Sequence, residues 1–159
     1  MIDIRFPTAL QIMLSLALAQ QRSVPHLTSS QLAESLGANP SFVRKLLVPL
    51  VQGKLLRSRM GKAGGVTLAR PAAEITLRDI YRAVVADAKI WAPRTGIPHR
   101  CLVSSNVQGY FEELIDDAQE AILSMLGQRT LIHALTELES RESAKRIASK
   151  VRLPSTSQR

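Results

Sequence analysis

Apolar residues recur at helical spacing along most of this chain, and only two short segments alternate between apolar and polar positions. Residues 9–21 are apolar nearly all round, which predicts a buried helix. Helices are also predicted over 28–36 and 41–52, with a kink or an early end at Pro49, because proline lacks a backbone donor. Residues 37–39, Gly-Ala-Asn, break the pattern between them. Two short helices joined by a tight turn are typical of a helix-turn-helix.

The two alternating segments, residues 55–59 and 66–69, predict short strands. Residues 60–65 contain three glycines and lie between them, which indicates a tight hairpin turn. Another helix, capped by Thr76, is expected to follow over residues 75–84. The predicted fold is therefore mainly α with one small β-hairpin.

A single long helix is predicted over residues 105–127. Ser105 to Gln108 has the form of a capping box, and Gly127 ends the apolar pattern. Two apolar stripes run along this helix: Val107, Phe111, Leu114, Ala118, Ala121 and Met125 form the first, and Tyr110, Ile115, Ile122 and Leu126 form the second. A helix with two apolar faces can pack on its own domain with one and on a partner subunit with the other.

Charge is sorted by segment. The net charge is +8, from 21 basic and 13 acidic residues, and no carboxylate lies between Ser35 and Ala73. That segment carries Arg44, Lys45, Lys54, Arg57, Arg59, Lys62 and Arg70, whereas an acidic cluster follows later, at Glu112, Glu113, Asp116, Asp117 and Glu120. A basic balance alone suits nucleic acid or an anionic membrane surface. Because this basic segment coincides with the helix-turn-helix and the hairpin, we expect double-stranded DNA as the partner.

The second helix of a helix-turn-helix places its N-terminal residues against base edges in the major groove. Its outward polar residues here are Ser41, Arg44 and Lys45. Arg44 can make a bidentate contact to guanine, and Lys45 is better suited to phosphate. Arg57, Arg59 and Lys62 of the hairpin add candidate DNA contacts; the alternative is a solvated charged face.

The N-terminal apolar run raises the question of a signal peptide. Residues 10–19 end in a small-x-small triplet, yet Asp3 beside Arg5 replaces the positive lead that a signal peptide carries. The run is also about half the ~20 residues needed to span a bilayer. A buried helix is the better interpretation, and we expect no membrane partner. One cysteine excludes an intrachain disulfide framework and a multi-cysteine zinc site, and it suits the reducing cytoplasm.

Three local motifs together identify a family. They are the glycine pattern Gly61-x-x-Gly64-Gly65-x-x-Leu68-Ala69, the run Ile75-Thr76-Leu77-x-Asp79-Ile80, and Cys101-Leu102 before the long helix. With them, residues 3–138 resemble the iron–sulfur cluster regulator family of IscR/NsrR-type winged-helix transcription factors. The resemblance implies a homodimeric DNA-binding regulator, expected to be a repressor. It also implies a wing that touches the minor groove and a long helix that forms the dimer.

The chain departs from the pattern of that family at two places. Cluster-binding members usually have three cysteines before the long helix, often with a histidine three residues after the last. Here only Cys101 is kept, and Ser104 stands at the histidine position. We therefore expect no cofactor and no metal; a cluster held by ligands from both subunits is the alternative, since a cluster normally takes four ligands. The arginine often found before the first wing glycine is Met60, which Arg59 and Lys62 flank.

Cys101 follows Arg100 and precedes the long helix, and both a positive neighbour and a helix N-terminus lower a thiol pKa. It is therefore the candidate residue for sensing an oxidant or a small-molecule effector, against the alternative of an inert cysteine. An enzyme with Cys101 as nucleophile and His99 as base is a rival hypothesis. Because no oxyanion loop or acidic orienter is evident, we expect no enzyme and no catalytic residue.

The predicted organisation has four parts. Residues 1–85 form the winged helix-turn-helix DNA-binding domain, and residues 86–104 form the sensing loop. Residues 105–139 comprise the dimerisation helix and a C-terminal helix, and residues 140–159 form a basic, flexible tail. A further hypothesis is a winged-helix protein-interaction module that does not bind DNA.

Overall fold

The computed structural model describes residues 3–61, 64–85, 88–92, 94–98 and 100–151. Within them lie six α-helices, one 3-10 turn (η1) and a two-stranded antiparallel sheet. In chain order the elements are α1 (Arg5–Gln21), α2 (Ser29–Leu36), α3 (Pro40–Gln52), β1 (Leu56–Arg59), β2 (Gly65–Leu68), η1 (Ala72–Glu74), α4 (Leu77–Val85), α5 (Leu102–Gly127) and α6 (Leu131–Val151). The predicted class, mainly α with one hairpin, is confirmed.

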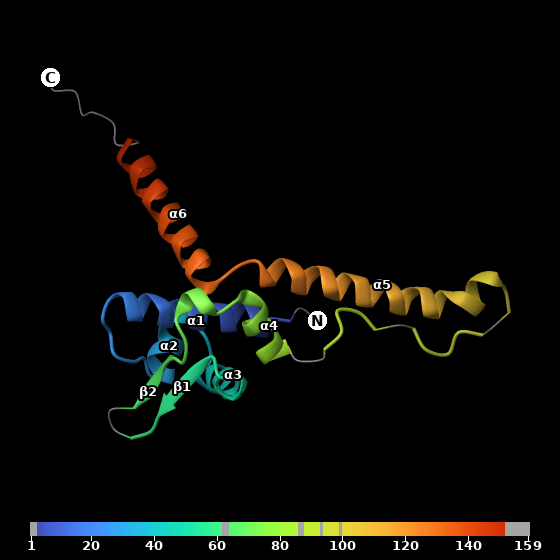
Figure 1. Cartoon of the computed structure of the whole chain (residues 1–159), viewed down its shortest axis with the longest axis horizontal. Coiled ribbons are helices and arrows are strands. Elements are labelled where there is room, and N and C mark those ends of the chain that lie inside the picture. The colour runs from blue at the N-terminus through green and yellow to red at the C-terminus, as the bar shows by residue number, and fades with distance from the viewer. Residues whose placement is uncertain (1–2, 62–63, 86–87, 93, 99, 152–159) are drawn as a thin grey trace.

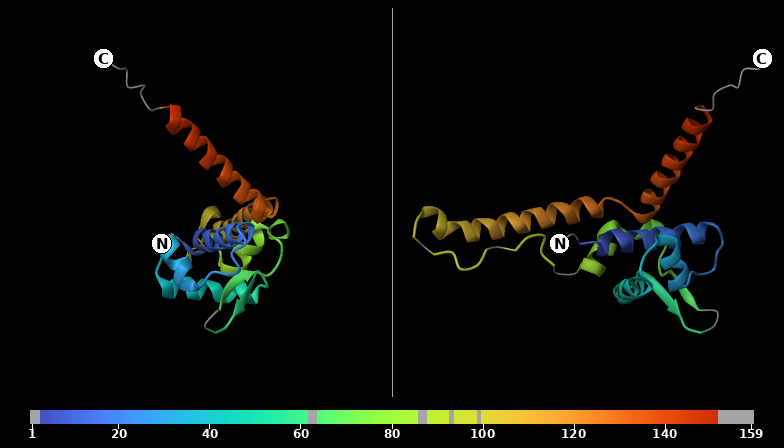
Figure 2. Two further views of the ribbon diagram at one scale, coloured as in Figure 1. Left: turned by 90° about the vertical axis from the view of Figure 1, so that its left-hand side faces the viewer. Right: turned by 180° about the vertical axis from the view of Figure 1, so that it is seen from behind.

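Two long helices leave the N-terminal domain in different directions (Figure 1). The domain itself consists of α1 to α4 and the hairpin of β1 and β2, which projects at its lower edge beside α3. The α5 helix extends away as an arm, and the described residues between α4 and α5 run beside it (Figure 2). Among the described residues, no helix combines the length and apolar character that crossing a membrane requires.

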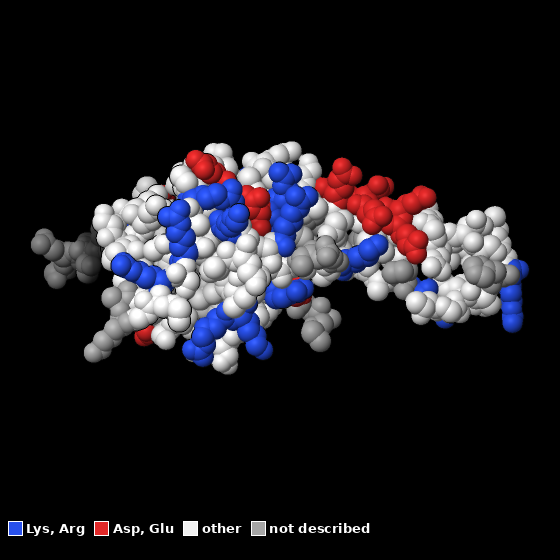
Figure 3. Space-filling model, turned by 60° about the horizontal axis from the view of Figure 1, so that its bottom comes forward, with Lys and Arg blue, Asp and Glu red and all other residues white. Residues whose placement is uncertain are grey.

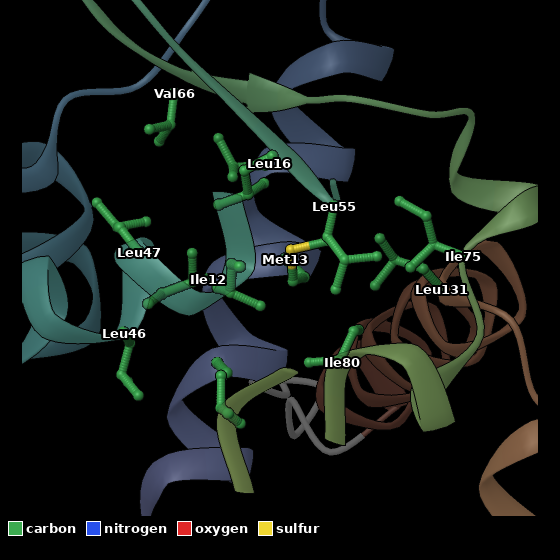
Figure 4. Close-up of a cluster of buried hydrophobic side chains, with 14 of the residues drawn as sticks. Ile12, Met13, Leu16, Leu46, Leu47, Leu55, Val66, Ile75, Ile80 and Leu131 are labelled. Carbon is green, nitrogen blue, oxygen red and sulfur yellow. The ribbon is translucent and has the colours of Figure 1, made fainter. Parts of the chain in front are cut away.

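Helix α1 lies at the centre of the hydrophobic core. It contacts α2, α3, α4, α6 and β2, which explains why it is apolar nearly all round. Ile12 and Met13 are fully buried, and Figure 4 shows them between side chains of α3, α4 and α6. Leu131, at the start of α6, is also fully buried, so α6 is anchored to the domain at its N-terminal end.

The helix-turn-helix forms from local signals. In α2, Thr28 and Gln31 make a capping box, in which the Thr28 hydroxyl accepts a hydrogen bond from the Gln31 backbone N–H at 3.1 Å. Gly37 then ends α2 in the left-handed conformation, with φ of 59°. Asn39 caps α3 by accepting a hydrogen bond from the Ser41 N–H at 2.8 Å. The expected early end at Pro49 is wrong, because α3 continues to Gln52 with its apolar face packed in the core.

Close packing against the hairpin requires a glycine at position 65. A Cβ atom there would lie 2.6 Å from His26 Cδ2 and 2.8 Å from the Leu27 carbonyl oxygen. Next to it, Val66 exchanges two backbone hydrogen bonds with Leu27, at 2.8 and 3.2 Å. The segment before α2 thus lies directly on β2, and His26 has a structural position there.

The connection between α5 and α6 is hydrogen-bonded to the segment that starts α4. The Leu77 N–H donates to the Arg129 carbonyl at 2.9 Å, and the Leu131 N–H donates to the Ile75 carbonyl at 2.8 Å. Beside them, the predicted Thr76 cap is confirmed, because its hydroxyl accepts from the Asp79 N–H at 3.1 Å. The connection after the arm is therefore hydrogen-bonded directly to the winged-helix domain.

The predicted start of the long helix at Ser105 is wrong, because α5 begins at Leu102 and takes in the last residues assigned to the loop. Cys101 is the N-cap. Its sulfur accepts from the Ser104 N–H at 3.5 Å, while the Cys101 N–H donates to the Ser104 hydroxyl at 3.0 Å. This capping box was missed because cysteine is not among the residues that usually cap helices.

The prediction of a loose tail from Ser140 onward is wrong for the residues described, because α6 continues to Val151. Ion pairs one helical turn apart support it, with Arg141 4.0 Å from Glu137 and Arg146 3.2 Å from Glu142. A mostly polar continuation of a helix can form when such pairs and good helix-forming residues supply the stability. Residues 152–159 lie outside the described part of the chain.

Candidate nucleic-acid interface

The outward face of α3 carries the three predicted recognition residues. Ser41, Arg44 and Lys45 are exposed, while the opposite face buries Val43, Leu46, Leu47 and Leu50 in the core. This packing fixes the rotation of the helix, so the polar side chains cannot turn inward. The structure thus places these three residues together on one surface.

Neither cation on this face is neutralised by an acidic side chain. Within the described residues, Arg44 and Lys45 take part in no ion pair. The Arg44 guanidinium lies 3.5 Å from the Ser41 hydroxyl, a long contact that leaves most of its donors directed at solvent. Such donors are available for an anionic ligand.

The hairpin adds cations beside the helix. Arg57 and Arg59 are exposed on β1, and because they are two residues apart they share one face of the strand. They pair across the hairpin with Thr67 and Gly65. The predicted contact residue Lys62 lies outside the described residues.

Arg70 does not belong to this surface. Although the carboxylate-free segment includes it, its guanidinium lies 3.5 Å from the Asp79 carboxylate of α4. The sequence could not show this pairing, because the two residues belong to different elements that meet only in the folded chain.

Basic and acidic side chains are unevenly distributed over the face of the molecule that Figure 3 shows. Lysine and arginine gather on the winged-helix domain, and the acidic cluster of α5 forms a separate patch along the arm. One cluster member, Asp116, lies 3.6 Å from Lys89 of the adjacent loop, and both side chains are exposed. The resulting field attracts a polyanion to the domain and repels it from the arm.

Two exposed apolar residues lie among these cations, and sequence reasoning missed the first of them. Val48, on α3, is 55% exposed, and Met60, directly after β1, is 95% exposed. The signal for Val48 was available, because it follows Arg44 by four residues and Lys45 by three, which puts all of them on one side of a helix.

The predicted sensing residue Cys101 lies at the far end of the arm and is exposed. Hydrogen bonds from the Ser104 side chain, and then from the backbone N–H groups of Ser104 and Val103, hold the pKa of this thiol below its ordinary value. His99 lies outside the described residues. Beside the thiol is a mostly apolar hollow of about 480 Å³, lined by Ala92, Arg94, Ile97, Val103, Val107 and Phe111 among others.

The described residues of one chain do not fit an iron–sulfur cluster. No three histidine, cysteine or acidic side chains among them come together as a ligand group, whereas a cluster normally takes four ligands. Cys101 stands alone at the start of α5. His26 packs against Gly65, and His133 is exposed on α6. The Trp91 ring lies 6.4 Å from that of Phe111, and Trp91 is 49% exposed.

Comparisons with known proteins agree with this architecture. A family model described as Rrf2, iron-dependent transcriptional regulator, matches residues 2–137. YwnA of Bacillus subtilis, named as an HTH-type transcriptional regulator, is 27% identical over 138 residues, which cover 87% of this chain and 99% of YwnA.

Two solved structures share the fold. A protein from Lactobacillus plantarum, titled as a transcriptional regulator, superposes with a TM-score of 0.74 at 19% identity and covers 94% of this chain and 99% of its own. IscR of T. potens superposes with a TM-score of 0.66 at 20% identity and covers 89% of this chain and 90% of its own. At these identities the likeness shows the winged-helix fold alone.

Proposed function

The chain belongs to the Rrf2 family of transcriptional regulators, and from this premise we propose that it binds operator DNA as a homodimer and represses transcription. The family and its named relatives are transcriptional regulators, not enzymes, so the hypothesis of a Cys101 nucleophile with a His99 base is set aside. Occupying a promoter is enough to block transcription, so repression needs no further catalytic or activating domain.

The main support for DNA binding is a group of exposed cations on the winged-helix domain. The exposed face of α3 and the adjacent strand β1 present Arg44, Lys45, Arg57 and Arg59 on the same domain, with no acidic neighbour in their segment. A helix in the major groove would bring Arg44 to a base edge and Lys45 to a phosphate, and a hairpin against the backbone would bring Arg57 and Arg59 to phosphates.

Salt dependence tests the proposal. Duplexes are first selected by the protein from a random-sequence pool, and their dissociation constant is then measured by fluorescence anisotropy between 50 and 200 mM salt. If each subunit neutralises four phosphates, the slope of log K against log salt is about −7, which corresponds to a loss of roughly 10⁴-fold in affinity over this range. A change of less than tenfold would contradict binding through these cations.

The arm supports a homodimer. Of its two apolar stripes, the second faces the chain's own domain, because Leu126 is buried in the hydrophobic core and Ile122 packs against it, although Tyr110 of that stripe is 67% exposed. The first stripe leaves Leu114 42% and Met125 45% exposed, with no cover from the described residues. A second copy of α5 would bury these side chains.

The length of the arm suits the spacing of a DNA site. With 26 residues, α5 is about 39 Å long. Half-sites of a dimeric helix-turn-helix protein lie about 34–36 Å apart, one turn of the duplex. Two arms paired along their length would therefore hold two winged-helix domains at a separation of the right order.

We propose Cys101 as the residue through which an oxidant alters DNA binding. Its thiolate would attack one oxygen of hydrogen peroxide, so that an S–O bond forms, the O–O bond breaks and hydroxide leaves, which gives a sulfenic acid. Oxidation changes the group that caps α5 and so disturbs the start of the arm. DNA binding by the natural protein should then weaken after peroxide treatment, and that of Cys101→Ser should not change.

The low thiol pKa gives a separate prediction. Because hydrogen bonds favour the thiolate, Cys101 should react with iodoacetamide at a lower pH than a free cysteine does. Ser104→Ala removes the strongest of these bonds, so the pKa should rise and alkylation at pH 7 should slow. Ser105→Ala is the matched control, since the side chain of Ser105 makes no hydrogen bond to the thiol. Equal rates in the two variants would contradict this assignment.

A further inference from the structure

We propose that Val48 reads the methyl group of a thymine in the major groove, an inference that rests on the proposed function. Val48 lies on α3 and is 55% exposed, whereas the other exposed residues on its side of the helix are polar or charged: Ser41, Arg44, Lys45 and Gln52. Its aliphatic side chain has no hydrogen-bonding group, so it can add to DNA recognition only through an apolar contact.

The position of Val48 on the helix supports the assignment. At 3.6 residues per turn, Val48 lies only about 20° from Ser41 and about 60° from Lys45 around the helix axis. It is therefore near the middle of the outward face, not at its edge. Its height along the axis is about 10 Å from Ser41, so the two residues would contact base pairs about three steps apart.

The core prevents α3 from hiding this side chain. Leu47 and Leu50, on either side of Val48 in sequence, are 9% and 0% exposed and belong to the hydrophobic core. Any rotation of α3 about its axis that buried Val48 would pull Leu47 and Leu50 out of the hydrophobic core. In the free protein the valine therefore stays in water, and a ligand that approaches the face of Arg44 and Lys45 must meet it.

The chemistry of the major groove identifies the group that Val48 fits. Each base pair presents hydrogen-bond donors and acceptors there, and the C5-methyl of thymine is the one apolar group among them. Placing Val48 against a donor or acceptor would remove water from that group without replacing the hydrogen bond. The methyl group offers a contact without this cost.

Replacing thymine by deoxyuridine tests the inference, because this change removes only the methyl group. In a duplex selected by the protein, each thymine is replaced in turn and the dissociation constant is measured. At one position per half-site, deoxyuridine should weaken binding by the natural protein about fourfold, which is the expected effect of one buried methyl group. Val48→Ala should remove this difference at that position and leave the other positions unchanged.

Two control variants show whether the loss of the deoxyuridine effect is specific to Val48. Val103→Ala makes the same change at a valine that is 66% exposed on the arm, and it should keep the full deoxyuridine effect. Met60→Ala, on the hairpin, should keep it as well. If a sequence is selected but no position shows a methyl effect that Val48→Ala removes, the inference fails and the proposed function stands. If no sequence is enriched over random DNA, the proposed function itself fails.

Discussion

Replacing Arg44 and Lys45 together by alanine should weaken binding to the selected duplex by about 10³-fold. Arg44 is placed to contact a base pair, where a bidentate contact is worth about 1–3 kcal/mol, and Lys45 is placed to neutralise a phosphate. Each subunit of a dimer loses both contacts. Because two phosphate contacts disappear from the complex, one from each subunit, the salt slope should also become shallower by about 1.8.

A control variant that loses the same charge from α6 shows whether the position of the two cations on α3 matters for DNA binding. Arg141 and Lys145 are also an arginine and a lysine on an exposed helix surface, but they lie on α6, away from α3. Arg141→Ala/Lys145→Ala therefore lowers the net charge equally and should change the dissociation constant by less than threefold. Unchanged binding in the Arg44→Ala/Lys45→Ala variant would instead favour the hypothesis of a protein-interaction module that does not use this face for DNA.

Local signals were enough to predict the helix-turn-helix. The caps at Thr28 and Asn39 and the left-handed Gly37 depend on residues only a few positions apart, so the sequence contains all that determines them. The start of α5 and the length of α6 were missed for a related reason. Cys101 acts as an unusual cap, and the residues of α6 after Ser140 are mostly polar or charged, although Leu131 and Leu135 at its start are buried in the core.

The candidate site was predictable where helical spacing alone decides which way a side chain points. Ser41, Arg44 and Lys45 follow directly from the apolar positions of α3. The ion pair of Arg70 with Asp79 was not predictable, because it depends on how α4 packs beside the hairpin. Similarly, the two stripes of α5 were visible in the sequence, but which of them faces the domain became clear only from the burial of Leu126 in the hydrophobic core.

Placing charges on the first apolar stripe of α5, which is partly exposed, is also expected to have a large effect. Leu114→Glu/Met125→Glu should convert the dimer into a monomer of about the 17.5 kDa chain mass, as measured by light scattering after gel filtration. Two glutamates per chain would be buried between arms that already carry the acidic cluster, so both desolvation and like-charge repulsion oppose pairing. DNA affinity should fall by at least 100-fold, because each domain then binds its half-site alone.

Two leucine- or isoleucine-to-glutamate changes on α6 are the control that distinguishes a loss of dimerisation from a loss of folding. Leu138 and Ile147 on α6 are 47% and 65% exposed, so Leu138→Glu/Ile147→Glu introduces the same charges at similar exposure on the other long helix. This control should remain dimeric and bind DNA normally. Because Leu114 and Met125 are already partly in water, the arm variant should keep its circular dichroism spectrum as a monomer. A natural protein that is itself monomeric at DNA-binding concentrations, or an arm variant that still dimerises, would show that the exposed stripe of α5 is not the dimer interface.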